Sequence, residues 1–108
     1  MPTKHFLLFL FSCFCLTACG PSEEAQQIAS LTGDAAAGQP LYQSNCAVCH
    51  GQDARGGTYD VDLVDHATHH DDEHFAQVIL SGDGDMPAFE GQLEDQEIAD
   101  IIAYIRSL

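Results

Sequence analysis

Apolar residues recur at helical spacing in the last part of the chain. The stripe consists of Ile98, Ile101, Ile102, Ile105 and Leu108. Side chains three, four and seven positions apart lie on one face of an α-helix. The pattern therefore predicts an amphipathic helix over residues 94–108, with Glu94 at its N-cap.

A second helix is predicted over residues 35–45, because Asp34 is a suitable N-cap in front of an alanine-rich start. Pro40 lies inside this segment, where it has no N–H to donate and crowds the preceding turn. The helix therefore either kinks at Pro40 or begins near Gln39.

A third helix is predicted over residues 73–80, with Asp71 or Asp72 as its cap and Gly82 just past its end. No stretch alternates between polar and apolar residues as a half-buried strand does. The sequence predicts an all-α fold in which three or more short helices are joined by long loops.

The N-terminal segment has the form of an export signal. Residues 6–16 are almost entirely apolar and follow a short start that contains Lys4. This run is shorter than the roughly 20 residues of a transmembrane helix. Its end, Leu16-Thr17-Ala18-Cys19, resembles the lipobox of bacterial lipoproteins, in which cleavage precedes a cysteine that then carries diacylglycerol. We interpret residues 1–18 as a lipoprotein signal peptide and Cys19 as the lipidation site. The alternative is an ordinary signal peptide with a chance cysteine.

The next segment shows little apolar periodicity and is rich in Pro, Ser, Gln, Glu and Thr. We interpret residues 19–33 as a flexible tether, and about 14 such residues have a root-mean-square reach of roughly 20 Å. Residues 34–108 form the folded domain. The expected location is the bacterial cell envelope, with the protein lipid-anchored on the periplasmic side or the outer face of a membrane and without other membrane contact.

Cysteine usage points to a cofactor. Of five cysteines, Cys13 and Cys15 leave with the signal peptide and Cys19 carries lipid. Only Cys46 and Cys49 remain in the folded domain, two residues apart, so no structural disulfide is expected. A domain of about 75 residues usually needs disulfides, a metal or a cofactor for stability.

The charge balance is strongly acidic. After removal of the signal, two arginines face 17 carboxylates, a formal charge of −15. Nucleic acid is excluded as a partner, because its binding depends on cations that neutralise phosphates. An acidic body favours a redox partner with a basic docking surface, while charge that only keeps the protein soluble is the alternative. We expect a monomer.

The segment Cys46-Ala47-Val48-Cys49-His50 has the spacing of c-type haem attachment. Two thiols add to the haem vinyl groups, and the adjacent histidine supplies an axial nitrogen to the iron. Met86 is the only methionine that remains after signal removal, and it lies in a glycine-containing loop before Pro87. Met86 is therefore the predicted sixth ligand, which leaves the iron with no vacant position. A thioredoxin-like use of the cysteines would require a βαβ pattern that is absent.

The segment from residue 33 to residue 108 resembles the small class I bacterial cytochromes c. The shared features, in addition to the CxxCH motif, are Gly38 and Tyr42 on the first helix, a glycine-rich loop at 56–57, the Met86-Pro87 pair and the terminal helix. The resemblance implies one covalent haem c wrapped by short helices. It also implies that Gly38 lets the first and last helices cross closely, with Tyr42 packed near Ile101 and Tyr104.

The resemblance has a further implication for the axial histidine. In many relatives, a proline carbonyl accepts a hydrogen bond from that histidine. Val61 holds the matching position here.

Four histidines follow the haem motif, three before the predicted third helix and one in its first turn, namely His66, His69, His70 and His74. Their setting among acidic residues favours a hydrated surface. The alternatives are opportunistic metal binding, a zinc site shared with Cys46 and Cys49, and a role as haem ligand.

These sequence patterns are consistent with three functions. The first is electron transfer by a protein that is not an enzyme. The second is a haem enzyme subunit or sensor with a labile sixth ligand. The third is an exported metal-binding lipoprotein that uses Cys46, Cys49 and the histidines. A filled His/Met coordination favours the first.

Overall fold

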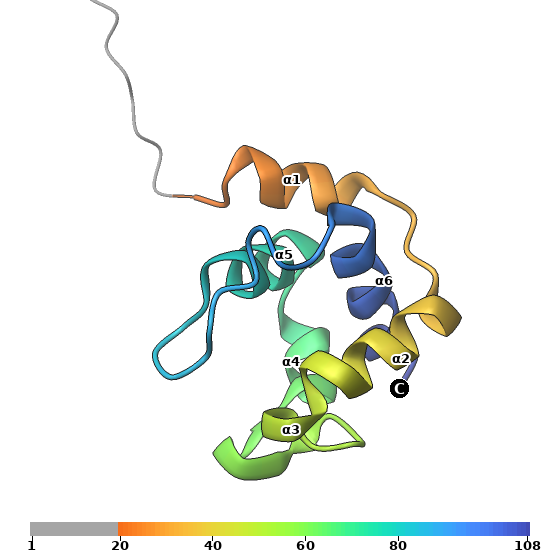
Figure 1. The fold of residues 1–108 in the computed structure, drawn as a ribbon, viewed down its shortest axis with the longest axis vertical. Coiled ribbons are helices and arrows are strands. Elements are labelled where there is room, and N and C mark those ends of the chain that lie inside the picture. The colour runs from red at the N-terminus through yellow and green to blue at the C-terminus, as the bar shows by residue number, and fades with distance from the viewer. Residues whose placement is uncertain (1–19) are drawn as a thin grey trace, which may run out of the picture.

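The computed structural model describes residues 20–108. The predicted signal peptide and Cys19 lie outside the described residues. Helix α2 (Ala35–Asn45) crosses α6 (Asp95–Arg106) at the centre of the fold (Figure 1). Gly38 is buried at this crossing, where a Cβ would overlap the backbone carbonyl of Asp100. The ring of Tyr42 packs against Tyr104, with ring centroids 5.3 Å apart. The close crossing implied for Gly38 is confirmed.

Helix α2 begins at Ala35 rather than near Gln39. The side chain of Asp34 accepts hydrogen bonds from the N–H groups of Ala36 at 2.9 Å and Ala37 at 3.3 Å. The helix continues through Pro40, which lies on its exposed side. The N-cap therefore decides where α2 begins, because it satisfies N–H groups that have no partner within the helix.

The other two predicted helices are present with shifted ends. Helix α5 runs over Asp72–Ser81, and the Asp71 side chain caps it by accepting from His74 N–H at 2.9 Å. In α6, the carboxylate of Glu97 accepts from the N–H of Glu94 at 2.9 Å, which strengthens a start that lacks Ser or Thr. The apolar stripe of α6 is buried as predicted, except for Leu108, which lies past the helix end and is exposed.

Three further short helices and a small sheet complete the described chain. The helices are α1 (Glu23–Ser30), α3 (Ala47–His50) and α4 (Leu63–His69), and the antiparallel strands are β1 (Arg55–Gly56) and β2 (Val61–Asp62), joined by the 3₁₀ turn η1 (Gly57–Tyr59). These strands were not predicted from the sequence, because two-residue strands are too short to show alternation. The fold is all-α apart from it, as predicted.

Helix α1 overturns the prediction of a flexible tether over residues 19–33. Ala25 and Ile28 are buried against α5 and α6. The helix is capped by Ser22, whose hydroxyl accepts from Ala25 N–H at 3.1 Å and whose own N–H donates to Gln77 Oε1 at 2.6 Å. Two apolar residues three positions apart are too few to read as a periodic pattern, but they are enough to fill a groove that the rest of the domain provides.

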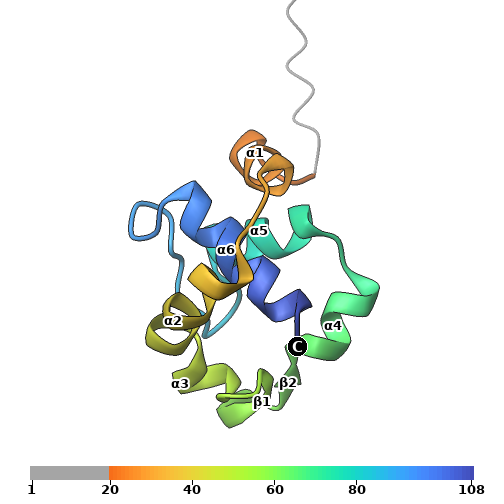
Figure 2. The ribbon, with the colours of Figure 1, turned by 90° about the vertical axis from the view of Figure 1, so that its right-hand side faces the viewer.

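Helix α1 lies at the opposite end of the domain from α3 and the small sheet (Figures 1 and 2). Among residues 20–108, no helix is both long and apolar enough to span a bilayer.

Candidate functional site

Helix α3 is a single turn that follows α2 directly. The N–H of Cys46 donates to the carbonyl of Tyr42 at 2.8 Å, and the N–H of His50 donates to the carbonyl of Cys46 at 2.9 Å. Residues three and four apart on a helical turn lie on the same side. The turn therefore places Cys46, Cys49 and His50 together, and all three line one cavity.

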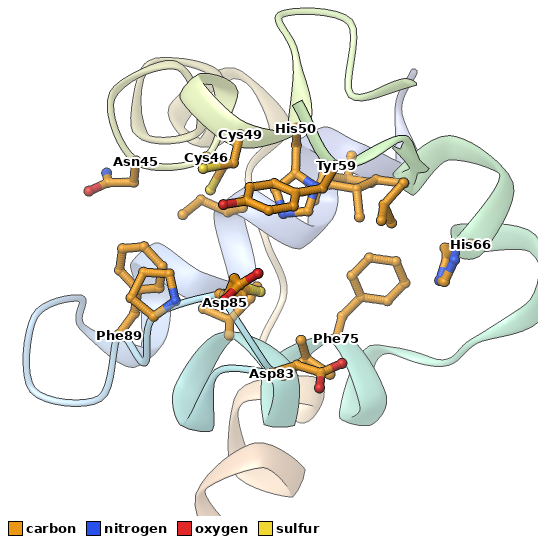
Figure 3. A pocket seen from close by; sticks show the side chains of 18 of the residues that line it. Asn45, Cys46, Cys49, His50, Tyr59, His66, Phe75, Asp83, Asp85 and Phe89 are labelled. Atoms are coloured by element: carbon orange, nitrogen blue, oxygen red, sulfur yellow. The ribbon is translucent and has the colours of Figure 1, made fainter. Parts of the chain in front are cut away.

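The cavity has a volume of about 450 Å³, within the range of small-molecule and cofactor sites. Figure 3 shows Cys46, Cys49 and His50 on one wall and Phe75, Asp83 and Asp85 on the facing wall. Its apolar lining comes from α5, α6 and the loop between them, through Phe75, Val78, Ile79, Phe89, Ile101 and Ile105.

Met86 lines the same cavity from the loop between α5 and α6. A tight turn holds it, because Met86 N–H donates to the carbonyl of Asp83 at 2.9 Å and the return bond measures 3.2 Å. Gly82 opens this turn with φ +73°, and a Cβ there would overlap the carbonyl of Met86. The loop then returns along α5, where the N–H of Phe89 donates a hydrogen bond to the carbonyl of Ile79 at 2.9 Å. The structure thus brings Met86 into the cavity that holds the CxxCH motif.

The imidazole of His50 is half-buried. Burial, and then the neighbouring His66, lower the pKa of His50, so the ring is neutral and has a nitrogen lone pair that can bind a metal. Its Nδ1 is fully buried and makes no hydrogen bond within residues 20–108. The hydrogen bond expected from His50 to the carbonyl of Val61 is therefore not formed, although Val61 also lines the cavity.

Cys46 and Cys49 are free thiols in this structure. Burial raises the pKa of Cys46 to about 11, and the nearby Cys49 adds to the rise. The sulfur is therefore uncharged at neutral pH, which suits an apolar cavity wall.

Two of the four histidines reach the cavity. His66 and His74 belong to its lining, although both remain exposed to solvent. The predicted hydrated surface did not include this position of His66 and His74 beside the cavity. The i, i+4 spacing of His66, His70 and His74 was the available signal. Within the described chain, no group of three His, Cys, Asp or Glu side chains is arranged to hold a metal ion, so the zinc site with Cys46 and Cys49 is not formed.

Other lining residues gave no sequence signal. Tyr59 reaches the cavity from η1 and is 51% exposed, and Asn45 reaches it from the end of α2. Only the folding of the loop after α3 brings Tyr59 back over the cavity.

The donor set fits one class of cofactor. Two free thiols, an imidazole with an unpartnered Nδ1 and a thioether all border one apolar cavity. Thioether and imidazole are axial ligands of haem iron, and paired thiols attach haem covalently. The fold and the site define a small helical domain built for a covalently held haem.

Comparisons with known proteins agree. Residues 33–105 match the family described as "Cytochrome C oxidase, cbb3-type, subunit III". A cytochrome c-553-like protein of Synechocystis is 36% identical over 83 residues, which are 76% of this chain and 76% of that protein. Cytochrome c6 of Limnospira maxima is 35% identical over 68% of this chain and 91% of its own length. The structure of cytochrome c6 from the diatom Phaeodactylum tricornutum superposes with a TM-score of 0.53, at 30% identity, over 68% of this chain and 91% of that chain.

The chain belongs to the cytochrome c family. Proteins of this family carry one covalently bound haem c and transfer electrons, and this function is the one predicted from the sequence.

Proposed function

We propose that this chain is an exported, lipid-anchored electron carrier with His/Met-ligated haem. Cys46 and Cys49 hold the haem through thioether bonds, and His50 and Met86 bind its iron. When bound, haem c supplies a one-electron couple at iron. The observation that carries the proposal is that the motif on α3 and Met86 on a distant loop line one apolar cavity.

The chain's own residues determine how this couple behaves. The helical turn of α3 fixes the positions of the two sulfurs and of the imidazole of His50 relative to one another. The turn at Asp83 and Met86 fixes the thioether on a separate loop. With both His50 and Met86 bound, the iron would have no site for a substrate, and this favours a carrier over an enzyme or sensor with a labile ligand.

The ligand assignment is tested with Met86→Ala in the haem-loaded protein. Loss of the thioether should open the iron to carbon monoxide or cyanide, convert the visible spectrum towards high spin and lower the reduction potential. Ala88→Ser changes an exposed residue of the same loop and should leave all three properties unchanged. A Met86→Ala protein that stays low-spin and excludes added ligands would refute the assignment.

The lipid anchor rests on the Leu-Thr-Ala-Cys sequence that ends at Cys19. Mass spectrometry of the mature N-terminus should find a diacylglycerol-modified Cys19. Cys19→Ala should release the protein from the membrane fraction, whereas Cys15→Ala, within the cleaved segment, should not. Membrane retention of the Cys19→Ala protein would exclude this anchor.

A second role is supported by the family match itself. The family description names a subunit of a cytochrome oxidase, so the chain is also a candidate for the electron-entry component of an oxidase complex. Stoichiometric co-purification with haem-copper oxidase subunits, after detergent extraction of the native membrane, distinguishes a subunit from a free carrier.

A further inference from the structure

Three histidines form a continuous stack at one end of the haem cavity. The ring centroids of His66 and His70 lie 5.3 Å apart, with an interplanar angle of 26°. The ring centroids of His70 and His74 lie 4.1 Å apart, with an interplanar angle of 17°. The stack joins α4 to the start of α5. Its two outer members, His66 and His74, line the cavity.

The cavity has no arginine or lysine among its described lining residues. Arg55 contacts Asp62 at 3.5 Å on the small sheet. Arg106 forms an ion pair with Asp72 and donates to the carbonyls of Ala67 and His70, and it is not among the residues that line the cavity. The only lining side chains able to carry positive charge are therefore imidazoles, and His50 is already assigned to iron.

Haem c would bring two carboxylates into this cavity. With its vinyl groups bonded to Cys46 and Cys49, these carboxylates would lie on the side of the cavity away from the two cysteines. Figure 3 shows His66 on the far side of His50 from Cys46 and Cys49. Buried or half-buried carboxylates require hydrogen-bond donors or cations, whereas Asp83 and Asp85, on the facing wall, add further negative charge.

We propose that His66 and His74 face the haem carboxylates and that the histidine stack takes up a proton when the haem is reduced. The inference rests on the proposed haem site. It assigns this chain a redox-linked proton site on the stack, which makes its reduction potential depend on pH near neutrality.

The coupling balances in charge. Reduction adds one electron, which comes from a redox partner and resides on iron. An imidazole of the stack that takes up a proton from water offsets the added electron, and this uptake amounts to a fraction of a proton per electron when the two proton affinities differ by a small factor. A positive imidazolium is more stable beside the reduced haem than beside the oxidised haem. The proton affinity of the stack is thus higher in the reduced protein, and the reduction potential falls as pH rises between the two pKa values.

Stacking limits the stack to few protons. Two imidazolium rings about 4 Å apart would repel. Partial burial, and then His74, His66 and His69, lower the pKa of His70, while Asp71 opposes the shift. The charged and titratable groups on the elements around the stack are Asp65 and His69 on α4, Asp71 at the N-cap of α5, Asp72 and Glu73 on α5, Arg106 on α6, His50 on α3, and Asp83 and Asp85 on the loop after α5.

The test is redox potentiometry of the haem-loaded full chain between pH 5 and pH 8. The wild-type potential should fall across this range, with a proton affinity that differs roughly fivefold between the redox states, the lower end of couplings between sites in proteins. That ratio corresponds to about 40 mV for a one-electron couple. His66→Asn and His74→Asn should each reduce the fall, and the double variant should remove it.

His69→Asn is the matched control. His69 lies on the same helix as His66, but its Nδ1 contacts the Asp65 carbonyl at 3.1 Å, and it does not line the cavity. Because His69 acts on His70 in both redox states, this variant should retain the size of the fall in potential, although the pH at which the fall occurs can move. A second readout is proton NMR of the histidine rings, where His66 and His74 should titrate at higher pH in the reduced protein and His69 should titrate at the same pH in both states.

Two outcomes would overturn the inference. One is a wild-type potential that is flat over this range. The other is a slope that survives in the double variant. In both cases an unchanged low-spin spectrum would show that the haem site itself is correct, whereas failure of the proposed function would appear as a wrong spectrum or as absent haem.

Discussion

Gly38 sets the distance between α2 and α6 at the residue scale. A Cβ at this position would overlap the carbonyl of Asp100, which belongs to the backbone of α6 and cannot rotate away. Asp100 is itself fixed, because its Oδ1 accepts from Asp34 N–H at 2.8 Å and from Gln96 Nε2 at 2.9 Å. The two helices can accommodate a methyl group only by separating.

We therefore expect Gly38→Ala to reduce the free energy of unfolding by about 1 to 3 kcal/mol, the usual cost of overpacking. Urea unfolding of the haem-loaded protein, followed by circular dichroism, measures this loss. Gln39→Ala changes the exposed neighbour on the same helix and should alter stability by less than about 0.5 kcal/mol. Equal stability of the two variants would show that α2 and α6 have room for a methyl group at their crossing.

Helix α1 carries the main consequence at the scale of elements. It converts most of the predicted tether into a packed part of the domain, held by Ile28 and Ala25. Gln96 on α6 adds a bond from its Nε2 to the carbonyl of Thr32 at 3.0 Å. The lipid on Cys19 would then be separated from α1 by only a few residues, so the domain has less freedom than a long flexible tether allows.

Ile28→Ala tests whether α1 packs on the domain in solution. We expect it to cost about 2 to 5 kcal/mol of local stability, because it removes most of a fully buried apolar side chain. Hydrogen exchange should show the amides of α1 losing protection while α2 and α6 keep theirs. Gln27→Ala, on the exposed side of α1, should leave the protection intact. Amides of α1 that are unprotected in the wild type would instead support the flexible tether.

The docking of α1 should also depend on pH through Glu24. Partial burial, and then the carboxylates of Asp95 and Glu90, raise the pKa of Glu24 above its ordinary value. A carboxyl whose pKa is higher in the folded state favours folding when it is protonated. Its contribution is therefore present at acidic pH and is lost as the pH rises through the folded-state pKa.

Protection of the α1 amides, corrected for intrinsic exchange, should accordingly fall as the pH rises through and above the ordinary carboxyl range. In Glu24→Gln, the protection of the α1 amides should not change with pH. Glu23→Gln, on the exposed side of the same turn, is the control and should keep the wild-type dependence. Protection that increases with pH would contradict the assignment.

Charge acts at the scale of the whole molecule. The proposed partner presents a basic surface, because 17 carboxylates outnumber the basic side chains and two of them, Asp83 and Asp85, are exposed where they line the cavity. Attraction between unlike surfaces raises the rate of encounter and weakens as salt shortens the Debye length, which is about 10 Å at 0.1 M.

The second-order rate of electron transfer with the physiological partner should fall steeply as ionic strength rises. Asp83→Asn and Asp85→Asn should each lower the rate at low salt and flatten its salt dependence. These changes leave the backbone bonds of the Met86 turn in place. Glu23→Gln, on α1 and outside the cavity lining, should have a smaller effect. A rate that is flat or rising with salt would show that the acidic residues serve solubility alone.

The sequence by itself determined the chemistry and the strongest helices. Cys46, Cys49 and His50 lie within one turn, so their relation is local and readable from spacing. The same holds for the isoleucine stripe of α6 and for the Asp34 cap, because periodicity and capping act over a few residues.

Only the tertiary structure decided what depends on contacts between distant segments. Helix α1 is stable because α5 and α6 provide a groove for two small apolar contacts. His66, His74 and Tyr59 border the cavity because α4, α5 and η1 pack around it. These contacts are set by the packing of the whole chain, and the helical spacing of the histidines shows only that they share a face, not that this face meets the cavity.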